Sequence, residues 1–177
     1  EGRAEEDVIR AKMIEHDEQV GTLLKKLKEL GVDDNTIVMY STDNGNELMY
    51  WPDGGYAPFA GEKGTTWEGG ERVPCLMKWP GHIKPGSVSN GVQNHEDVYA
   101  TLAAAAGLPD LKDKLLKGYE MNGTKYKVHL DGYNNLDHWT GKSAKSARRE
   151  IFYYDETDLM AIRVDAWKMH VGVKREG

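Results

Sequence analysis

The chain has 177 residues, with 23 basic and 29 acidic side chains and a formal net charge of −6. It holds no run of 18 apolar residues, which excludes a membrane span, and its scattered lysines and arginines argue against a nucleic-acid surface. The single cysteine, Cys75, excludes an intrachain disulfide and any zinc site built from several cysteines.

The amino terminus begins Glu1-Gly2-Arg3 and carries no initiating methionine, basic segment or apolar segment of a signal peptide. A helical pattern follows within a few residues. We therefore expect the chain to be a fragment or a processed product of a longer protein. Because any targeting segment would precede this start, the localisation stays open.

The first 107 residues alternate between helical and strand patterns, which indicates an α/β layer. Apolar residues spaced by three and four predict an amphipathic helix over 6–30, on whose stripe we expect His16 to be packed. The apolar run 36–41 is typical of a buried parallel strand, and 73–79 predicts a second strand. A glycine-rich loop is expected over 45–70 and an alanine-rich helix over 96–106.

The remaining residues have a different pattern. A short helix is expected over 111–116, and Asn122-Gly123 favours a hairpin turn. Segments that alternate with period two predict a small antiparallel sheet; they are 126–130, 151–154, 160–164 and 167–171. These patterns divide the chain into an α/β part, 1–107, and a subdomain with a small antiparallel sheet, 108–177.

Asp43-Asn44-Gly45 stands at the carboxyl end of the first predicted strand, where open α/β sheets bind ligands. A carboxylate beside an amide carbonyl offers hard oxygen donors, which suit Ca²⁺ or Mg²⁺ better than zinc. The same three residues are also an ordinary turn sequence. These three residues alone do not decide between a metal site and a turn.

A second candidate is the glycine-rich block 61–70, in which Lys63 lies near several glycines. A lysine in such a loop can approach an anion, with backbone amides close by. The block is not a nucleotide-binding P-loop, because the required spacing to a Gly-Lys-Ser/Thr motif is absent. A simple surface loop is the alternative.

Taken together and in this order, several segments resemble the type I sulfatases of the alkaline-phosphatase superfamily. The resemblance covers residues 8–171. Its motifs are Asp43-Asn44-Gly45, the block 61–70, Arg72-Val73-Pro74, Trp79-Pro80-Gly81, His95-Glu96-Asp97, Leu130-Asp131-Gly132-Tyr133-Asn134 and Thr140-Gly141-Lys142.

The resemblance implies a partial alkaline-phosphatase/sulfatase-like α/β layer followed by a small antiparallel C-terminal sheet. It implies that Asp43 and Asn44 ligate a divalent cation, usually Ca²⁺ and otherwise Mg²⁺, and that Lys63 contacts the sulfate ester as a catalytic and substrate-binding residue. In that reaction the cation polarises sulfate oxygens, and the lysine stabilises charge that develops on the leaving side.

One departure limits what the chain can do. Sulfatases convert a cysteine or serine in a Cys/Ser-x-Pro/Ala-x-Arg signature to formylglycine, and these 177 residues contain no such signature. Cys75 precedes Leu76-Met77-Lys78-Trp79 and is expected to be a buried structural thiol. We therefore expect the carboxyl-terminal portion of a sulfatase-like hydrolase, inactive alone.

Two alternatives remain at this point: a phosphoester or phosphonate hydrolase of the same superfamily, and a non-catalytic module for metal binding or assembly. The sequence also predicts an uncovered sheet edge, through which the chain could form a homo-oligomer.

Overall fold

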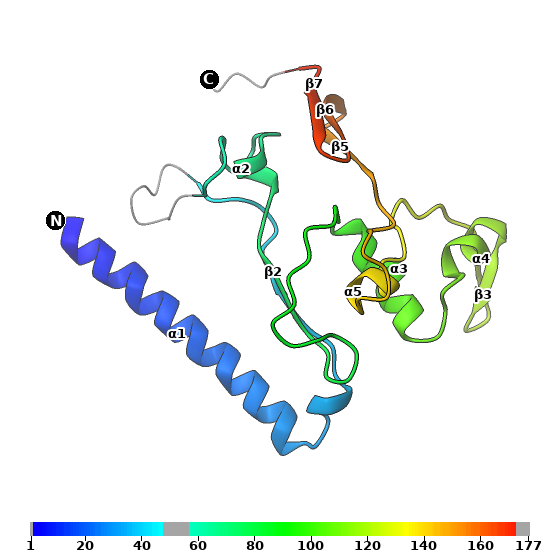
Figure 1. The fold of residues 1–177 in the computed structure, drawn as a ribbon, viewed down its shortest axis with the longest axis horizontal. Coiled ribbons are helices and arrows are strands. Elements are labelled where there is room, and N and C mark those ends of the chain that lie inside the picture. The colour runs from blue at the N-terminus through cyan, green and yellow to red at the C-terminus, as the bar shows by residue number, and fades with distance from the viewer. Residues whose placement is uncertain (1, 48–56, 173–177) are drawn as a thin grey trace. The chain divides into compact units, whose positions relative to one another are not determined.

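The computed structural model describes residues 2–47 and 57–172, and its ribbon is shown in Figure 1. The chain forms two compact units. The first runs to Ile83 and also takes in Tyr154–Asp158, and the second comprises Lys84–Tyr153 with Leu159–Gly172.

The first unit begins with the long helix α1 (Gly2–Glu29), which confirms the helix predicted from the apolar spacing. The helix ends at Glu29, and two residues later Gly31 has a φ of +67°, which is readily adopted only by glycine. The 3₁₀ turn η1 (Asp33–Asn35) follows. His16 is exposed rather than packed, and its Nε2 lies 2.9 Å from the Tyr40 hydroxyl. No helix in the described part of the chain is long and apolar enough to cross a bilayer.

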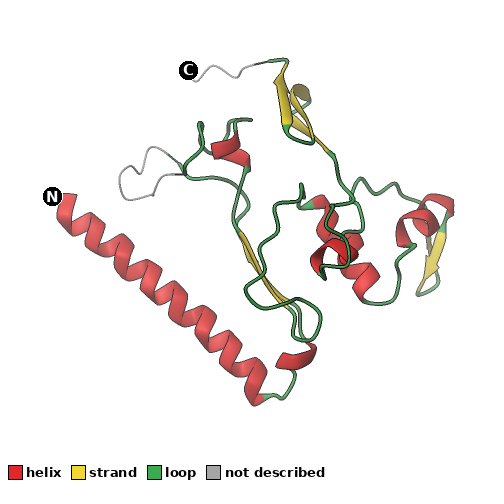
Figure 2. Ribbon diagram, viewed as in Figure 1, coloured by secondary structure: helices red, strands yellow, loops and turns green. Residues whose placement is uncertain are grey.

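Strand β1 (Val38–Ser41) pairs with β2 (Cys75–Lys78), and the two form a ribbon drawn in yellow in Figure 2. The pairing is antiparallel, with Val38 opposite Lys78, so the prediction of a parallel strand was wrong. An apolar run indicates a strand but does not fix the direction of its neighbour. The predicted burial of Cys75 was also wrong, because its side chain is exposed on this two-stranded ribbon.

The core of the second unit lies among short helices. They are α3 (Glu96–Ala105), α4 (Leu111–Lys117) and α5 (Leu136–Trp139). Their buried apolar side chains are Ala100, Ala104, Leu111, Leu115 and Trp139. The two longer helices confirm the helical predictions over 96–106 and 111–116.

The hairpin of β3 (Tyr119–Met121) and β4 (Thr124–Tyr126) turns at Asn122-Gly123, where φ is +50° and +76°. Positive φ at both positions is the geometry that this dipeptide favours. A three-stranded sheet follows, in the order β5 (Glu150–Asp155), β6 (Asp158–Val164) and β7 (Trp167–His170). The expected antiparallel sheet is therefore present.

The segment 127–130, however, is not a strand. The Val128 N–H donates to the carbonyl of Leu115, in the last turn of α4, at 3.1 Å. Helix ends leave carbonyl groups without partners, and this segment satisfies one of them instead of joining the sheet.

Candidate functional site

The candidate metal ligands Asp43 and Asn44 lie two and three residues after the end of β1, and Lys63 lies in the loop that precedes α2 (Glu68–Glu71). The sequence places these two segments about twenty residues apart. In the structure, backbone contacts join them within the first unit.

Gly45 makes the closest of these contacts. Its N–H donates to the carbonyl of Gly70 at 2.7 Å. A Cβ built on Gly45 would stand 1.7 Å from the carbonyl oxygen of Gly69. Since only a residue without a side chain permits this approach, the glycine of the Asp-Asn-Gly motif locks the end of β1 onto α2.

Gly69 and Gly70 also hold the loop that precedes α2. The Gly69 N–H donates to the carbonyl of Ala60 at 2.7 Å, and a Cβ on Gly70 would lie 2.3 Å from the Glu62 carbonyl oxygen. The Thr65 hydroxyl closes the turn by donating to that Glu62 carbonyl at 2.7 Å. The glycine-rich block is therefore an ordered turn packed on α2, and its glycines are needed for close approach.

Lys63 completes the connection. Its N–H donates to the Asn46 carbonyl at 2.8 Å, and its ammonium Nζ lies 3.6 Å from Glu47 Oε1. Half of the Lys63 side chain is exposed. The structure thus brings Lys63 beside the segment that carries Asp43 and Asn44, and adds Glu47, which the sequence did not single out.

The donor chemistry at the end of β1 fits a hard cation. The Asp43 carboxylate is exposed and receives a long hydrogen bond, 3.3 Å, from the Thr42 hydroxyl. The Asn44 side chain donates its Nδ2 to the Gly45 carbonyl at 2.8 Å, which leaves its Oδ1 to accept. Ca²⁺ takes six to eight oxygens, so these two residues supply only part of a coordination sphere. In the described ranges, no three His, Cys, Asp or Glu residues gather as a metal cluster.

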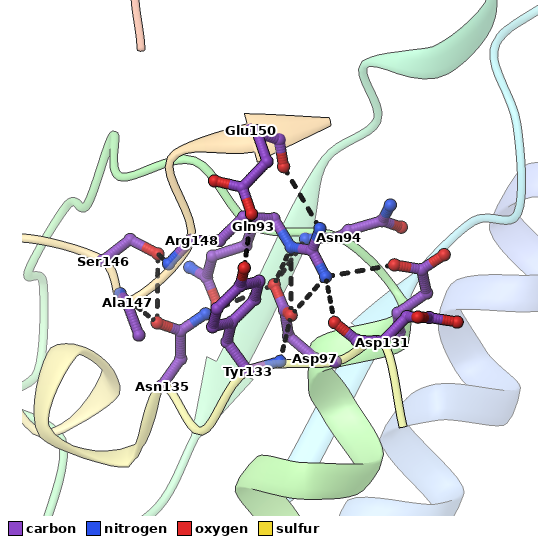
Figure 3. Close-up of polar contacts among 12 residues, drawn as sticks. Gln93, Asn94, Asp97, Asp131, Tyr133, Asn135, Ser146, Ala147, Arg148 and Glu150 are labelled. Carbon is purple, nitrogen blue, oxygen red and sulfur yellow. Dashed lines mark hydrogen bonds and ion pairs between the residues drawn. The ribbon is translucent and has the colours of Figure 1, made fainter. Parts of the chain in front are cut away.

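A polar centre in the second unit was not anticipated from the residues. Asp97, in the first turn of α3, is 1% exposed, and its carboxylate is the hub shown in Figure 3. It accepts from the backbone N–H groups of Asn94 and Tyr133 at 2.9 and 2.7 Å, and from Asn135 Nδ2 at 3.3 Å.

Arg148 supplies the compensating charge at this hub. Its Nε and Nη2 donate to the Asp97 carboxylate at 2.9 to 3.0 Å. Nη2 also reaches Glu96 Oε2 at 3.0 Å, and Nη1 donates to the Glu150 carbonyl at 3.1 Å. Both Asp97 and Tyr133 lie in motifs that carry the family resemblance, but nothing local in the sequence connects them to Arg148.

The comparisons with known proteins agree with these motifs. The family model described as Sulfatase matches residues 10–108. N-acetylgalactosamine-6-sulfatase of Rattus norvegicus is 35% identical over 159 residues, which cover 89% of this chain and 27% of that protein. Arylsulfatase A of Homo sapiens is 36% identical over 164 residues, which cover 89% of this chain and 29% of that protein.

A solved structure, that of the PsFucS1 sulfatase from Pseudoalteromonas sp., superposes with a TM-score of 0.78 at 34% identity. The match covers 93% of this chain and 30% of that one. The chain therefore spans less than a third of the length of these relatives. With more than half of its residues matched by the family model, and with the fold shared, the chain belongs to the sulfatase family.

Proposed function

We propose that this chain supplies two metal ligands, Asp43 and Asn44, and a sulfate-binding lysine, Lys63, to a hydrolase that cleaves sulfate monoesters with a divalent cation, Ca²⁺ or Mg²⁺. The observation that carries the proposal is the hydrogen bond from the Lys63 N–H to the Asn46 carbonyl at 2.8 Å, which fixes the lysine beside the metal-ligand segment. Membership of the sulfatase family supports the reaction class.

The division of labour follows from the chemistry of these groups. Asp43 and Asn44 would hold the cation, which when bound withdraws charge from sulfate oxygens. Lys63 would donate to the ester from the loop held on α2 and stabilise negative charge at the departing oxygen. Glu47, whose Oε1 lies 3.6 Å from the Lys63 Nζ, would hold the ammonium before an anion arrives.

The chain alone does not complete this site. No formylglycine signature occurs in these 177 residues, and a covalent nucleophile is what divides sulfate transfer into two easier steps. We therefore propose that the isolated chain does not cleave sulfate esters. The phosphoester and phosphonate alternatives, and the non-catalytic module, have no support among the relatives reported above.

The test is a titration of the 177-residue chain with Ca²⁺ and then with inorganic sulfate, followed by amide chemical shifts. We expect weak, millimolar binding, because most of the calcium ligands would be water. Shifts should cluster at residues 43–47 and 61–70. Asp43→Asn should weaken both steps, whereas Lys63→Met should weaken only the sulfate step.

Lys26→Met is the matched control, because Lys26 pairs with Glu29 on the surface of α1 at 3.2 Å. It should leave both titrations unchanged. Sulfate binding that survives Lys63→Met at full strength would remove the lysine from the site, and a tight calcium site would instead revive the metal-binding module.

The uncovered sheet edge leads to a separate proposal, that copies of the chain associate. In the described sheets β1 and β2 pair only with each other, so each has an outer edge, and such edges promote pairing between chains. Sedimentation velocity over a range of concentrations should show self-association, and a monomer at every concentration would refute it.

A further inference from the structure

Ser89 and His138 form a hydrogen-bonded pair within the second unit, separate from Asp43, Asn44 and Lys63. Ser89 lies in the segment that leads to α3, and its side chain is exposed. His138 lies on α5 and is 8% exposed. Ser89 Oγ is 2.6 Å from His138 Nε2. A hydroxyl that solvent reaches thus contacts an imidazole that is largely shielded.

A third group orients the imidazole. His138 Nδ1 lies 3.2 Å from the backbone carbonyl oxygen of Ser143. A carbonyl can only accept, so Nδ1 carries the hydrogen, and in the neutral ring Nε2 is then the acceptor for the Ser89 hydroxyl. Nucleophile, base and orienting acceptor therefore stand in the order that activates a serine.

The segment that carries Ser89 is held closely against α5. A Cβ on Gly91 would stand 2.3 Å from His138 Nε2, so only glycine allows this approach. Further along, Trp139 Nε1 donates to the Gln93 side-chain oxygen.

We propose that Ser89 and His138 form a Ser–His dyad, with the Ser143 carbonyl as its third member, that takes an acyl group from small activated esters. Ser89 Oγ attacks the ester carbonyl carbon while its proton passes to His138 Nε2. The bond to the leaving alcohol then breaks, and the proton moves from Nε2 to the departing oxygen. Water completes the cycle by the same route and releases the acid. This activity goes beyond sulfate ester cleavage and uses none of its residues.

The test is acetylation of the 177-residue chain by 4-nitrophenyl acetate, with release of nitrophenolate measured by absorbance and the modified residue found by peptide mass spectrometry. Ser87 is an internal control, because it is an exposed serine two residues away whose Oγ donates to the Lys84 carbonyl at 2.7 Å rather than to a base. We expect Ser89 to be acetylated about 100-fold faster than Ser87, the size of a general-base contribution.

His138→Gln separates a base from a structural anchor, since glutamine can hold the Ser89 hydroxyl but cannot accept its proton. Acetylation of Ser89 should fall to the rate of Ser87, and Ser87→Ala should leave it unchanged. Equal rates at Ser87 and Ser89 in the unaltered chain would overturn the proposal whatever the variants do. An unchanged Ser89 rate in a folded His138→Gln variant would also overturn it.

Discussion

Arg148 and Asp97 form a bidentate ion pair whose two partners are both buried, with the Arg148 side chain 4% and the Asp97 side chain 1% exposed. The guanidinium reaches the carboxylate through Nε at 2.9 Å and through Nη2 at 2.9 Å. A buried ion pair of this kind adds little stability compared with a well-packed apolar pair. Losing one partner, however, is strongly destabilising, because it leaves an unpaired charge in a site that water cannot reach.

Arg148→Met should therefore destabilise the chain strongly. We expect a loss of about 3 kcal/mol in the free energy of unfolding, the scale for breaking a buried pair, as measured by urea denaturation. Arg149→Met is the matched control, because the neighbouring arginine pairs with Asp165 in an exposed position. The control should unfold like the unaltered chain, and similar losses in the two variants would contradict a special role for Arg148.

The environment of Tyr133 predicts that the stability of the fold decreases at alkaline pH. Its hydroxyl donates to Glu150 Oε1, and this hydrogen bond, with partial burial, raises the pKa of the phenol. The neutral phenol is favoured in the folded state, so its contribution to stability is complete below about pH 10, the usual value. That contribution is lost as the pH rises through the higher folded pKa.

The measurement is an absorbance titration of tyrosinate in the folded chain. Tyr133 should ionise above the usual pH range of a tyrosine, and Tyr133→Phe should remove that late step. If the late ionisation persists in Tyr133→Phe, it does not belong to Tyr133. The hydrogen bond to Glu150 would then not raise the pKa of the Tyr133 phenol.

Gly45→Ala should disturb the candidate sulfatase site without touching its chemical groups. The new Cβ would stand 1.7 Å from the Gly69 carbonyl oxygen. Because this oxygen belongs to the backbone, it cannot move away by a rotamer change as a side-chain atom can. Overpacking of this kind costs about 1–3 kcal/mol, and the amide signal of Lys63 should shift. Gly21→Ala in α1 has open space around it and should stabilise the helix by about 0.5–1 kcal/mol.

The 177-residue chain should not hydrolyse a chromogenic aryl sulfate, with or without added Ca²⁺. Metal ligands and a lysine cannot replace the covalent nucleophile. The measurement is release of nitrophenol from 4-nitrophenyl sulfate, with Asp43→Ala assayed in parallel. Hydrolysis by the unaltered chain that disappears in this variant would refute the proposed inactivity, and a trace unaffected by the change would indicate a contaminating enzyme.

Local features were predictable from the sequence because their causes are local. The apolar spacing and Gly31 indicated α1 and the position of its carboxyl end, and Asn122-Gly123 indicated the β3–β4 turn. The family motifs indicated Asp43, Asn44 and Lys63, and the backbone contacts through Asn46 and Gly70 bring these segments together. Their chemical roles remain proposals.

Features that depend on distant partners were not predictable. Period-two alternation over 126–130 indicated a strand, but the Leu115 carbonyl takes the Val128 N–H. Likewise, the apolar run around Cys75 does not show how many strands or helices will pack on it, and Cys75 is exposed. Arg148 and Asp97 are 51 residues apart, and a lone arginine before a strand gives no sign of the carboxylate that it will meet.

The Asp97 hub also bears on the order in which the second unit assembles. Its partners lie 36 residues away, at Tyr133, and 51 residues away, at Arg148. Closing loops of this length costs chain entropy before any bond forms, so α3 and its neighbours can fold well before the carboxylate is fully paired. Interactions completed after the transition state slow unfolding rather than speed folding. The Asp97 hub would thus slow the unfolding of the second unit and leave its folding rate almost unchanged.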